Sequence, residues 1–160
     1  MTNNPHTFSV LVENEFGVLA RVASMFAGRG YNIDSLSVAP TLDPKYSLMM
    51  IVSTGSDHVI EQILKQLNRL MDVVKAEDLT RADYYGFETI LVSVSVSQSE
   101  QALVLKVIED FKATLVHQSD KTLILQLTGE SEKVESCLKQ LQVFKISKLV
   151  RTGTIAIPKE

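Results

Sequence analysis

The chain lacks several features that mark whole classes of proteins. It contains one cysteine and so cannot form an internal disulfide, which fits a reducing compartment. No apolar run reaches the roughly 18 residues of a membrane-spanning helix. A formal net charge of −3 predicts no general attraction to nucleic acids or anionic lipids. The first residues resemble neither a secretory signal nor a transit peptide, so we expect a cytoplasmic protein.

Residues that could carry catalysis are few and scattered. Cys137 lies on an apolar helical stripe, which favours a buried structural thiol over a nucleophile. His6, His58 and His117 have no metal-ligating neighbours at helical or hairpin spacing, so they are interpreted as surface histidines. Phosphate-loop and dinucleotide-binding motifs are missing. We therefore expect no catalytic residues and no metal, and favour a binding or regulatory protein over an enzyme.

The chain has 160 residues, of which 45% are hydrophobic and 22% charged, as in a globular protein of one domain or two small ones. In the first half, alternation or β-branched richness predicts strands over 7–13, 32–40, 46–54 and 72–79. Helical spacing predicts one helix from residue 18 and another over 55–70. The expected apolar face of the second helix comprises Ile60, Ile63, Leu64, Leu67 and Met71.

The same order returns after residues 80–87, which are predicted to be a linker. Strands are expected over 88–96, 113–119, 122–129 and 146–157. Ser97 and Glu100 have the spacing of a capping box before a third helix, and a fourth helix is expected over 130–141. Its apolar face would contain Val134, Cys137, Leu138 and Leu141.

These patterns predict an α+β protein built from two tandem ferredoxin-like βαββαβ units. The expected domains are residues 1–79 and 88–160, each an antiparallel four-stranded sheet with both helices on one face. Because the strands of the first sheet are rich in apolar residues, its uncovered face or edge is expected to pair with a second copy, giving a homodimer. Few aromatic residues, 6% of the chain, argue against base stacking on such a sheet.

The stretch "VENEFGVLARV" (12–22) joins the first strand to the first helix. Backbone N–H groups of Gly17, Val18 and Leu19 lie in the first helical turn and have no partners within the helix. Together with the helix dipole they could bind one carboxylate, and the Asn14 carboxamide could add a contact. Alternatively, Asn14 or Glu15 caps the helix and satisfies these donors.

A second polar position follows "GRG" (28–30), which is expected to end the first helix. Asn32 is either a turn-forming residue or an amide whose oxygen accepts a hydrogen bond from an ammonium group. Arg151, late in the chain, is either a contact for another domain or subunit or a surface arginine paired with a carboxylate.

The stretch "ENEFGVLARVASMFAGRGYNIDSLSVAPT" resembles the amino-terminal signature of small, regulatory subunits of acetolactate synthase, which begin with an ACT domain. Later segments, 62–80, 111–119, 127–138 and 148–157, also resemble this family. The chain departs from it at Lys145, where a glycine is frequent, and at its final residues Pro158, Lys159 and Glu160.

This resemblance implies a partner, a separate catalytic subunit that carries thiamine diphosphate, magnesium and FAD and makes the precursors of valine, leucine and isoleucine. The small subunit would bind no cofactor itself; it would raise the partner's activity and confer feedback inhibition by valine. In such proteins the effector lies between two ACT domains. The corresponding residues here are Asn14, Gly17, Val18 and Leu19 from one protomer, and Asn32 and Ile33 from the other.

The sequence is also compatible with two other functions. An ACT-type sensor could regulate a different biosynthetic enzyme, although the later matching segments speak against it. A small enzyme on a ferredoxin-like fold, such as a phosphatase, would need an arginine-rich anion loop. "ENEFG" contains no arginine, and Arg21 falls about one helical turn later.

Overall fold

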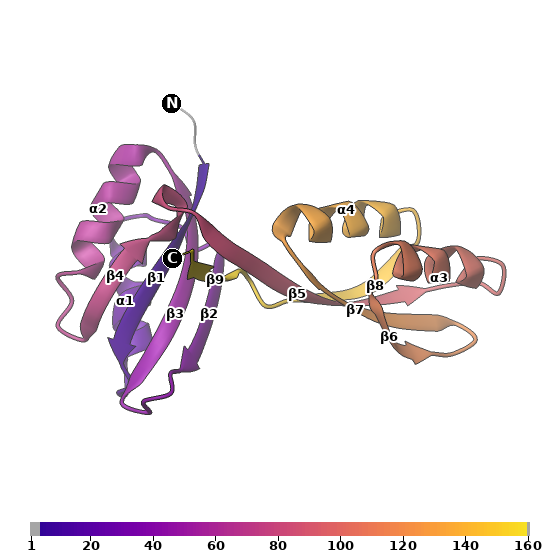
Figure 1. The fold of residues 1–160 in the computed structure, drawn as a ribbon, viewed down its shortest axis with the longest axis horizontal. Helices are drawn as coiled ribbons and strands as arrows, with labels where there is room; N and C mark the ends of the chain where they lie inside the picture. Colours follow the sequence, from indigo (N-terminus) through magenta and orange to yellow (C-terminus); the bar gives the residue numbers. More distant parts are fainter. Residues whose placement is uncertain (1–3, 160) are drawn as a thin grey trace. The chain divides into compact units, whose positions relative to one another are not determined.

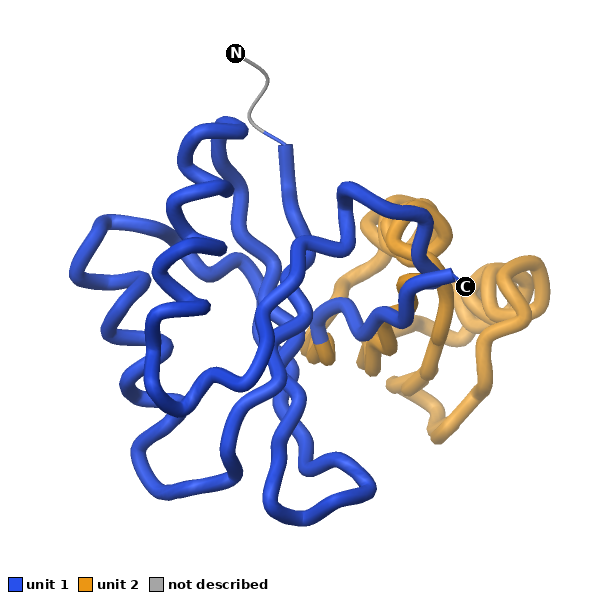
Figure 2. The backbone as a smooth tube through the Cα atoms, turned by 60° about the vertical axis from the view of Figure 1, so that its left-hand side comes forward, with its two compact units in different colours: residues 1–85, 153–160 blue, residues 86–152 orange. Residues whose placement is uncertain are grey.

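A computed structural model describes residues 4–159 of the chain, which form two compact units (Figures 1 and 2). The first unit comprises residues 1–85 together with 153–160, and the second comprises residues 86–152. The outer ends of the predicted domains, residues 1–3 and 160, lie outside the described residues.

The first unit has the predicted βαββαβ order. Its elements are β1 (Asn4–Glu13), α1 (Val18–Gly28), β2 (Ser35–Pro40), β3 (Tyr46–Gly55), α2 (Asp57–Leu67) and β4 (Val73–Asp78), followed by a short 3₁₀ helix, η1 (Leu79–Arg81). The strands form an antiparallel sheet in the order β2-β3-β1-β4, so β3 and β1 are central and β2 is an edge.

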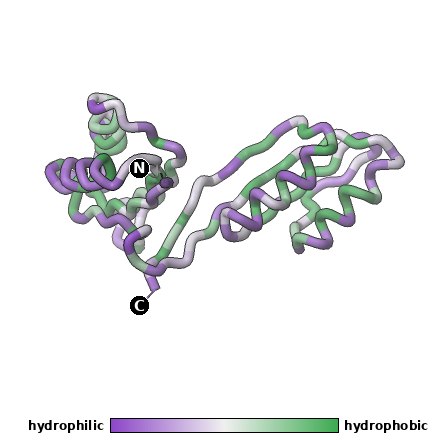
Figure 3. Tube along the Cα trace, turned by 90° about the horizontal axis from the view of Figure 1, so that it is seen from above, coloured by the Kyte–Doolittle hydropathy of each residue, from purple (hydrophilic) through white to green (hydrophobic). Residues whose placement is uncertain are grey.

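Alternation along the strands explains this unit's core. Phe8, Val10 and Val12 of β1 are buried toward the helices, whereas Ser9 and Leu11 point to the other face. Both helices place an apolar stripe on the same sheet face. Figure 3 shows the same kind of alternation between hydrophobic and hydrophilic residues most plainly along the helices of the second unit. Met71 was wrongly assigned to this stripe: α2 ends at Leu67, and the Met71 side chain is 98% exposed.

The second unit repeats the arrangement. It contains β5 (Tyr84–Ser95), α3 (Gln101–Asp110), β6 (Thr114–Gln118), β7 (Thr122–Gly129), α4 (Ser131–Leu141) and β8 (Lys145–Arg151), with the sheet order β6-β7-β5-β8. Both the Ser97 N–H and its hydroxyl donate to Glu100, at 2.7 and 2.6 Å, so these two residues interact before α3. The predicted capping box is only half formed, because Glu100 rather than Ser97 is the cap residue and no side chain caps the helix. The predicted α4 stripe is buried, Cys137 included.

The predicted last strand, 146–157, is two strands. The chain breaks at Gly153, where φ is +77°, and continues as β9 (Ile155–Pro158). Residues from Gly153 on belong to the first compact unit, although they lie within the range 88–160 of the predicted second domain. The predicted linker, 80–87, is also structured, because η1 and the start of β5 occupy most of it.

β9 covers part of the sheet face that the helices leave open (Figure 1). Ala156 of β9 is buried with Met50 of β3 and Leu79 of η1, and Leu48 and Tyr84 pack around them. Lys159 also donates its backbone N–H to Asp83 O at 2.8 Å. Part of the apolar excess that we assigned to a second copy is therefore covered by the chain itself.

No helix in the described part of the chain is long and apolar enough to cross a membrane. Among the same residues, no group of three or more histidine, cysteine, aspartate or glutamate side chains is arranged to hold a metal ion.

The buried thiol on α4 gives a simple test of this packing. Burial raises the pKa of Cys137, and the nearby Lys133 charge offsets this only in part. We expect the thiol to react with a disulfide reagent at least about tenfold more slowly in the native protein than in denaturant. Equal rates would show that α4 does not shield Cys137.

Candidate functional site

The N-terminal end of α1 is open. Gly17 occupies the cap position with φ +82°, and no side chain caps the helix. Within the described residues, the N–H groups of Leu19 and Ala20 donate to no other group, and that of Val18 makes only a long contact of 3.4 Å with Glu15 O. The alternative in which Asn14 or Glu15 caps the helix is therefore wrong. The positive end of the helix dipole remains available to an anion.

A glycine is required at position 17. A Cβ there would lie 2.9 Å from Nη1 of Arg21, and the positive φ disfavours other residues. Arg21 is itself held by Asp72, through Nε to Oδ2 at 2.6 Å and Nη2 to Oδ1 at 2.8 Å. The hydrogen bonds from this guanidinium lower the pKa of Asp72. The guanidinium of Arg21, held by Asp72, thus lies close to Gly17 at the open helix end.

Asn14 supports this corner of the molecule. Its Nδ2 donates to Pro44 O at 2.9 Å, and its Oδ1 accepts from the Ser47 hydroxyl at 3.1 Å. Its backbone N–H donates to Lys45 O at 2.7 Å. The side chain therefore ties the end of β1 to the turn between β2 and β3, and one amide hydrogen of Nδ2 remains for a further acceptor.

Asn32 lies in an exposed segment just before β2. Its Nδ2 donates to Asp34 Oδ1 at 2.6 Å, while Asp34 Oδ2 accepts from the Thr54 hydroxyl at 2.7 Å. The backbone oxygen of Asn32 accepts from Ser53 at 2.6 Å. This leaves the Oδ1 of Asn32 available as an acceptor, beside the negative charge of Asp34. Sequence reasoning missed Asp34, although an acidic residue two positions after an asparagine in a predicted turn is a signal for such a pair.

These two polar positions are not brought together within one unit. Asn14 contacts Ser47 near the start of β3, whereas Asn32 contacts Ser53 near its end. At about 3.3 Å per residue of strand, the six steps from Ser47 to Ser53 span about 20 Å. A small ligand held at one end therefore cannot reach the other end of the same unit.

The apolar residues near these positions divide into two groups. Val18 is only 2% exposed and faces the core, so only its backbone can meet a ligand. Leu19 is 44% exposed and Ile33 is half-buried, so both can line a site. Sequence reasoning missed Phe16 and Leu42, two fully exposed apolar side chains at the Asn14 end.

Arg151 has two carboxylate partners. Its Nη2 lies 2.6 Å from Oε1 of Glu88, which is buried, and its Nη1 lies 2.7 Å from Oε1 of Glu135. Of the two alternatives for this residue, the ion pair within its own unit is observed.

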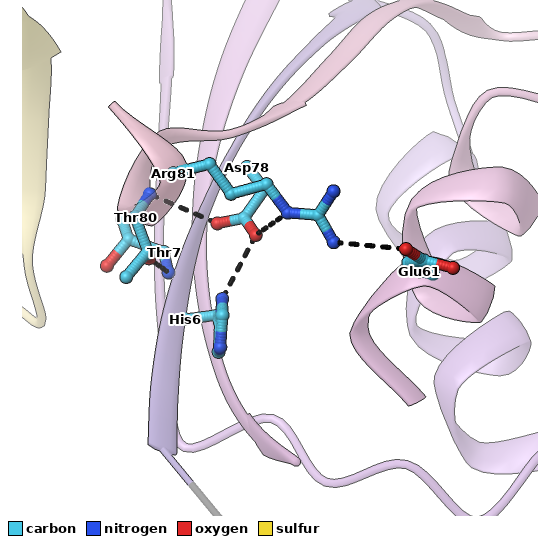
Figure 4. Close-up of polar contacts among 6 residues, drawn as sticks. All are labelled: His6, Thr7, Glu61, Asp78, Thr80 and Arg81. Carbon is cyan, nitrogen blue, oxygen red and sulfur yellow. Dashed lines mark hydrogen bonds and ion pairs between the residues drawn. The ribbon is translucent and has the colours of Figure 1, made fainter. Parts of the chain in front are cut away.

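The densest group of ionisable side chains joins β1, η1 and α2 (Figure 4). The Asp78 carboxylate, with a side chain 1% exposed, accepts from His6 Nδ1 at 3.0 Å, from Thr80 N–H at 3.1 Å and pairs with Arg81 Nε at 3.2 Å. His6 is therefore not the surface histidine that we predicted, whereas His58 and His117 are exposed as expected. All of these groups satisfy one another, which indicates a structural rather than a chemical role.

Replacing the central carboxylate should destabilise the first unit. We expect Asp78→Ala to lower the free energy of unfolding by about 1–3 kcal/mol, because it leaves several donors unpaired around a buried position. Glu77→Ala on the same strand is the control, since Glu77 makes only an exposed pair with Lys75. Equal urea midpoints for the two variants would contradict this structural role.

The fold and the open helix end define a class of protein. A family model described as the AHAS small subunit-like ACT domain matches residues 8–75, and one described as the small subunit of acetolactate synthase matches residues 87–160. The first unit is thus an ACT domain.

Relatives agree across both units. The chain is 40% identical to the acetolactate synthase small subunit of Aquifex aeolicus, over 97% of this chain and 81% of that one. It is 39% identical to the acetolactate synthase isozyme 3 small subunit of Salmonella typhimurium, over 93% and 92%. The crystal structure of the Thermotoga maritima small subunit superposes with a TM-score of 0.87 at 32% identity, covering 98% of each chain. The chain belongs to the family of small, regulatory subunits of acetolactate synthase.

Proposed function

We propose that this subunit binds L-valine between the first units of two copies and thereby subjects its catalytic partner to feedback inhibition, in the cytoplasm. The observation that carries the proposal is the pair of unlike polar positions at opposite ends of β3. One offers unpaired N–H groups at a helix N-terminus, and the other offers an amide oxygen beside a carboxylate. A free amino acid needs both, because it carries an ammonium and a carboxylate a few ångströms apart.

A two-fold axis would bring the two positions together. β2 is an edge strand, and its outer side is not paired within the described residues. If two copies pair through antiparallel β2 strands, the start of one β2 lies beside the end of the other. Asn32 and Asp34 of one copy then approach the end at which the other copy carries Asn14 and Gly17. Such an interface is self-complementary and generates two equivalent sites.

The side chains available suit a small aliphatic ligand. The carboxylate would accept from the N–H groups at the start of α1, and the ammonium would donate to Asn32 Oδ1 while Asp34 stabilises its charge. Leu19 and Ile33 would contact the aliphatic part. Leucine and isoleucine would make the same polar contacts as valine. Selection among these three amino acids would therefore depend on the space available for the aliphatic side chain.

The partner implied by the family is the catalytic, large subunit, which would hold thiamine diphosphate, magnesium and FAD. A ligand that bridges two small subunits stabilises the arrangement that it bridges. If the catalytic subunit prefers another arrangement, valine shifts the equilibrium by its difference in affinity, for which about 1–3 kcal/mol is typical of allosteric coupling.

Titration of the full chain tests the site. We expect saturable heat with L-valine, none with D-valine, and a stoichiometry of about one valine per protomer, because a two-fold interface has two equivalent sites. Asn32→Ala should weaken binding about tenfold by removing the acceptor for the ammonium group. Asn4→Ala, another exposed asparagine of the first unit, is the matched control. Unchanged binding in Asn32→Ala would exclude this site.

The proposed dimer has its own test. Phe16 is fully exposed in the single chain, so its removal should cost the isolated fold almost nothing. We expect Phe16→Ser to raise the dissociation constant of the dimer about tenfold in sedimentation experiments without lowering Tm. Val143→Ser, an exposed apolar residue of the second unit, should leave it unchanged. A dimer that is insensitive to Phe16 would place the interface elsewhere.

A further inference from the structure

Gly153 makes an unusually close approach to the first sheet. It is buried, it has φ +77°, and a Cβ at this position would lie 3.0 Å from Cβ and 3.1 Å from Oγ of Ser35. Only a glycine combines this backbone conformation with this spacing. The chain therefore passes from β8 to β9 with its backbone pressed against the first residue of β2.

Ser35 directly follows the segment that carries Asn32 and Asp34. It pairs with Val52 of β3, and the N–H of Asp34 donates to Val52 O at 2.8 Å. The backbone oxygen of Asn32 is held by Ser53, the next residue of β3. The position of Ser35 relative to β3 thus determines where the Asn32–Asp34 pair lies.

Gly153 cannot easily move away, because the residues after it are fixed in the first unit. Ala156 is buried against Met50 and Leu79, and the N–H of Lys159 donates to Asp83 O. A larger residue at position 153 must therefore displace either β9 from its small apolar cluster or the start of β2 from β3.

We propose that Gly153 is a positioning residue for the effector site, and that the return of the chain after β8 is a working part of that site. By its contact with Ser35 it holds the start of β2 where the Asn32 oxygen and the Asp34 carboxylate can receive an ammonium group. This inference rests on the proposed function. It makes ligand binding depend on Gly153, which is distant in sequence from all the residues proposed to contact the ligand.

The test uses the full chain and three substitutions. Gly153→Ala adds the Cβ that meets Ser35, and we expect it to raise the Kd for L-valine about tenfold while far-UV circular dichroism stays unchanged. Ser35→Gly removes the opposing Cβ and hydroxyl. The double variant Gly153→Ala/Ser35→Gly should recover part of the affinity, because it removes the contact with Ser35 while the disfavoured φ at residue 153 remains. Ser35→Val enlarges the side chain that faces Gly153, without placing a non-glycine residue at a positive φ. It should therefore also weaken binding.

The outcomes separate this inference from the proposed function. Wild-type affinity in both Gly153→Ala and Ser35→Val would overturn the positioning role while leaving the valine site intact. If the wild-type chain binds no valine, the proposed function fails, and hydrogen exchange then decides the positioning role. Exchange of the Asp34 amide should be faster in Gly153→Ala and restored in the double variant; an unchanged rate would overturn the inference.

Discussion

The pairing of β3 with both of its neighbours determines the geometry of the first unit. β3 is hydrogen-bonded to β1 from end to end and to β2 over the whole length of β2. A slip by one residue would turn Met49 and Ile51 out of the core, so the register has no close competitor. This register also fixes the positions of the loops and helix ends that follow the strands. Within one unit, the open end of α1 and the Asn32–Asp34 pair are therefore held apart by these paired strands.

A ferredoxin-like sheet has a second general constraint, because its helices cover one face only. In the first unit, β9 covers part of the other face, because Ala156 packs against Met50 and Leu79. Covering the open face in this way leaves the outer edge of β2 unpaired within the described residues. It also brings Gly153 against Ser35, the first residue of β2.

Periodicity and turn residues were sufficient to predict the order of elements, because the local patterns of helix and strand agree with their burial. The buried stripe of α4 and the alternating burial along β7 are examples. The break at Gly153 was not predictable, since apolar alternation continues on both sides of it. The environment of His6 was equally hidden, because its partner Asp78 is distant in sequence. For the same reason the candidate residue Asn14 was identified without its bonds to Pro44 and Ser47. The local sequence also left open whether Asn14 or Glu15 caps α1, because both types of residue are common helix caps.

The return of β9 also makes the first unit discontinuous along the chain, which affects how the protein is made. Translation delivers the βαββαβ core first, then the whole second unit, and only after that the strand that covers Met50 and Leu79. Closing so long a loop costs little more entropy than closing a shorter one, but it delays the contact. The nascent chain therefore exposes an apolar sheet face throughout synthesis of the second unit, until β9 has been made.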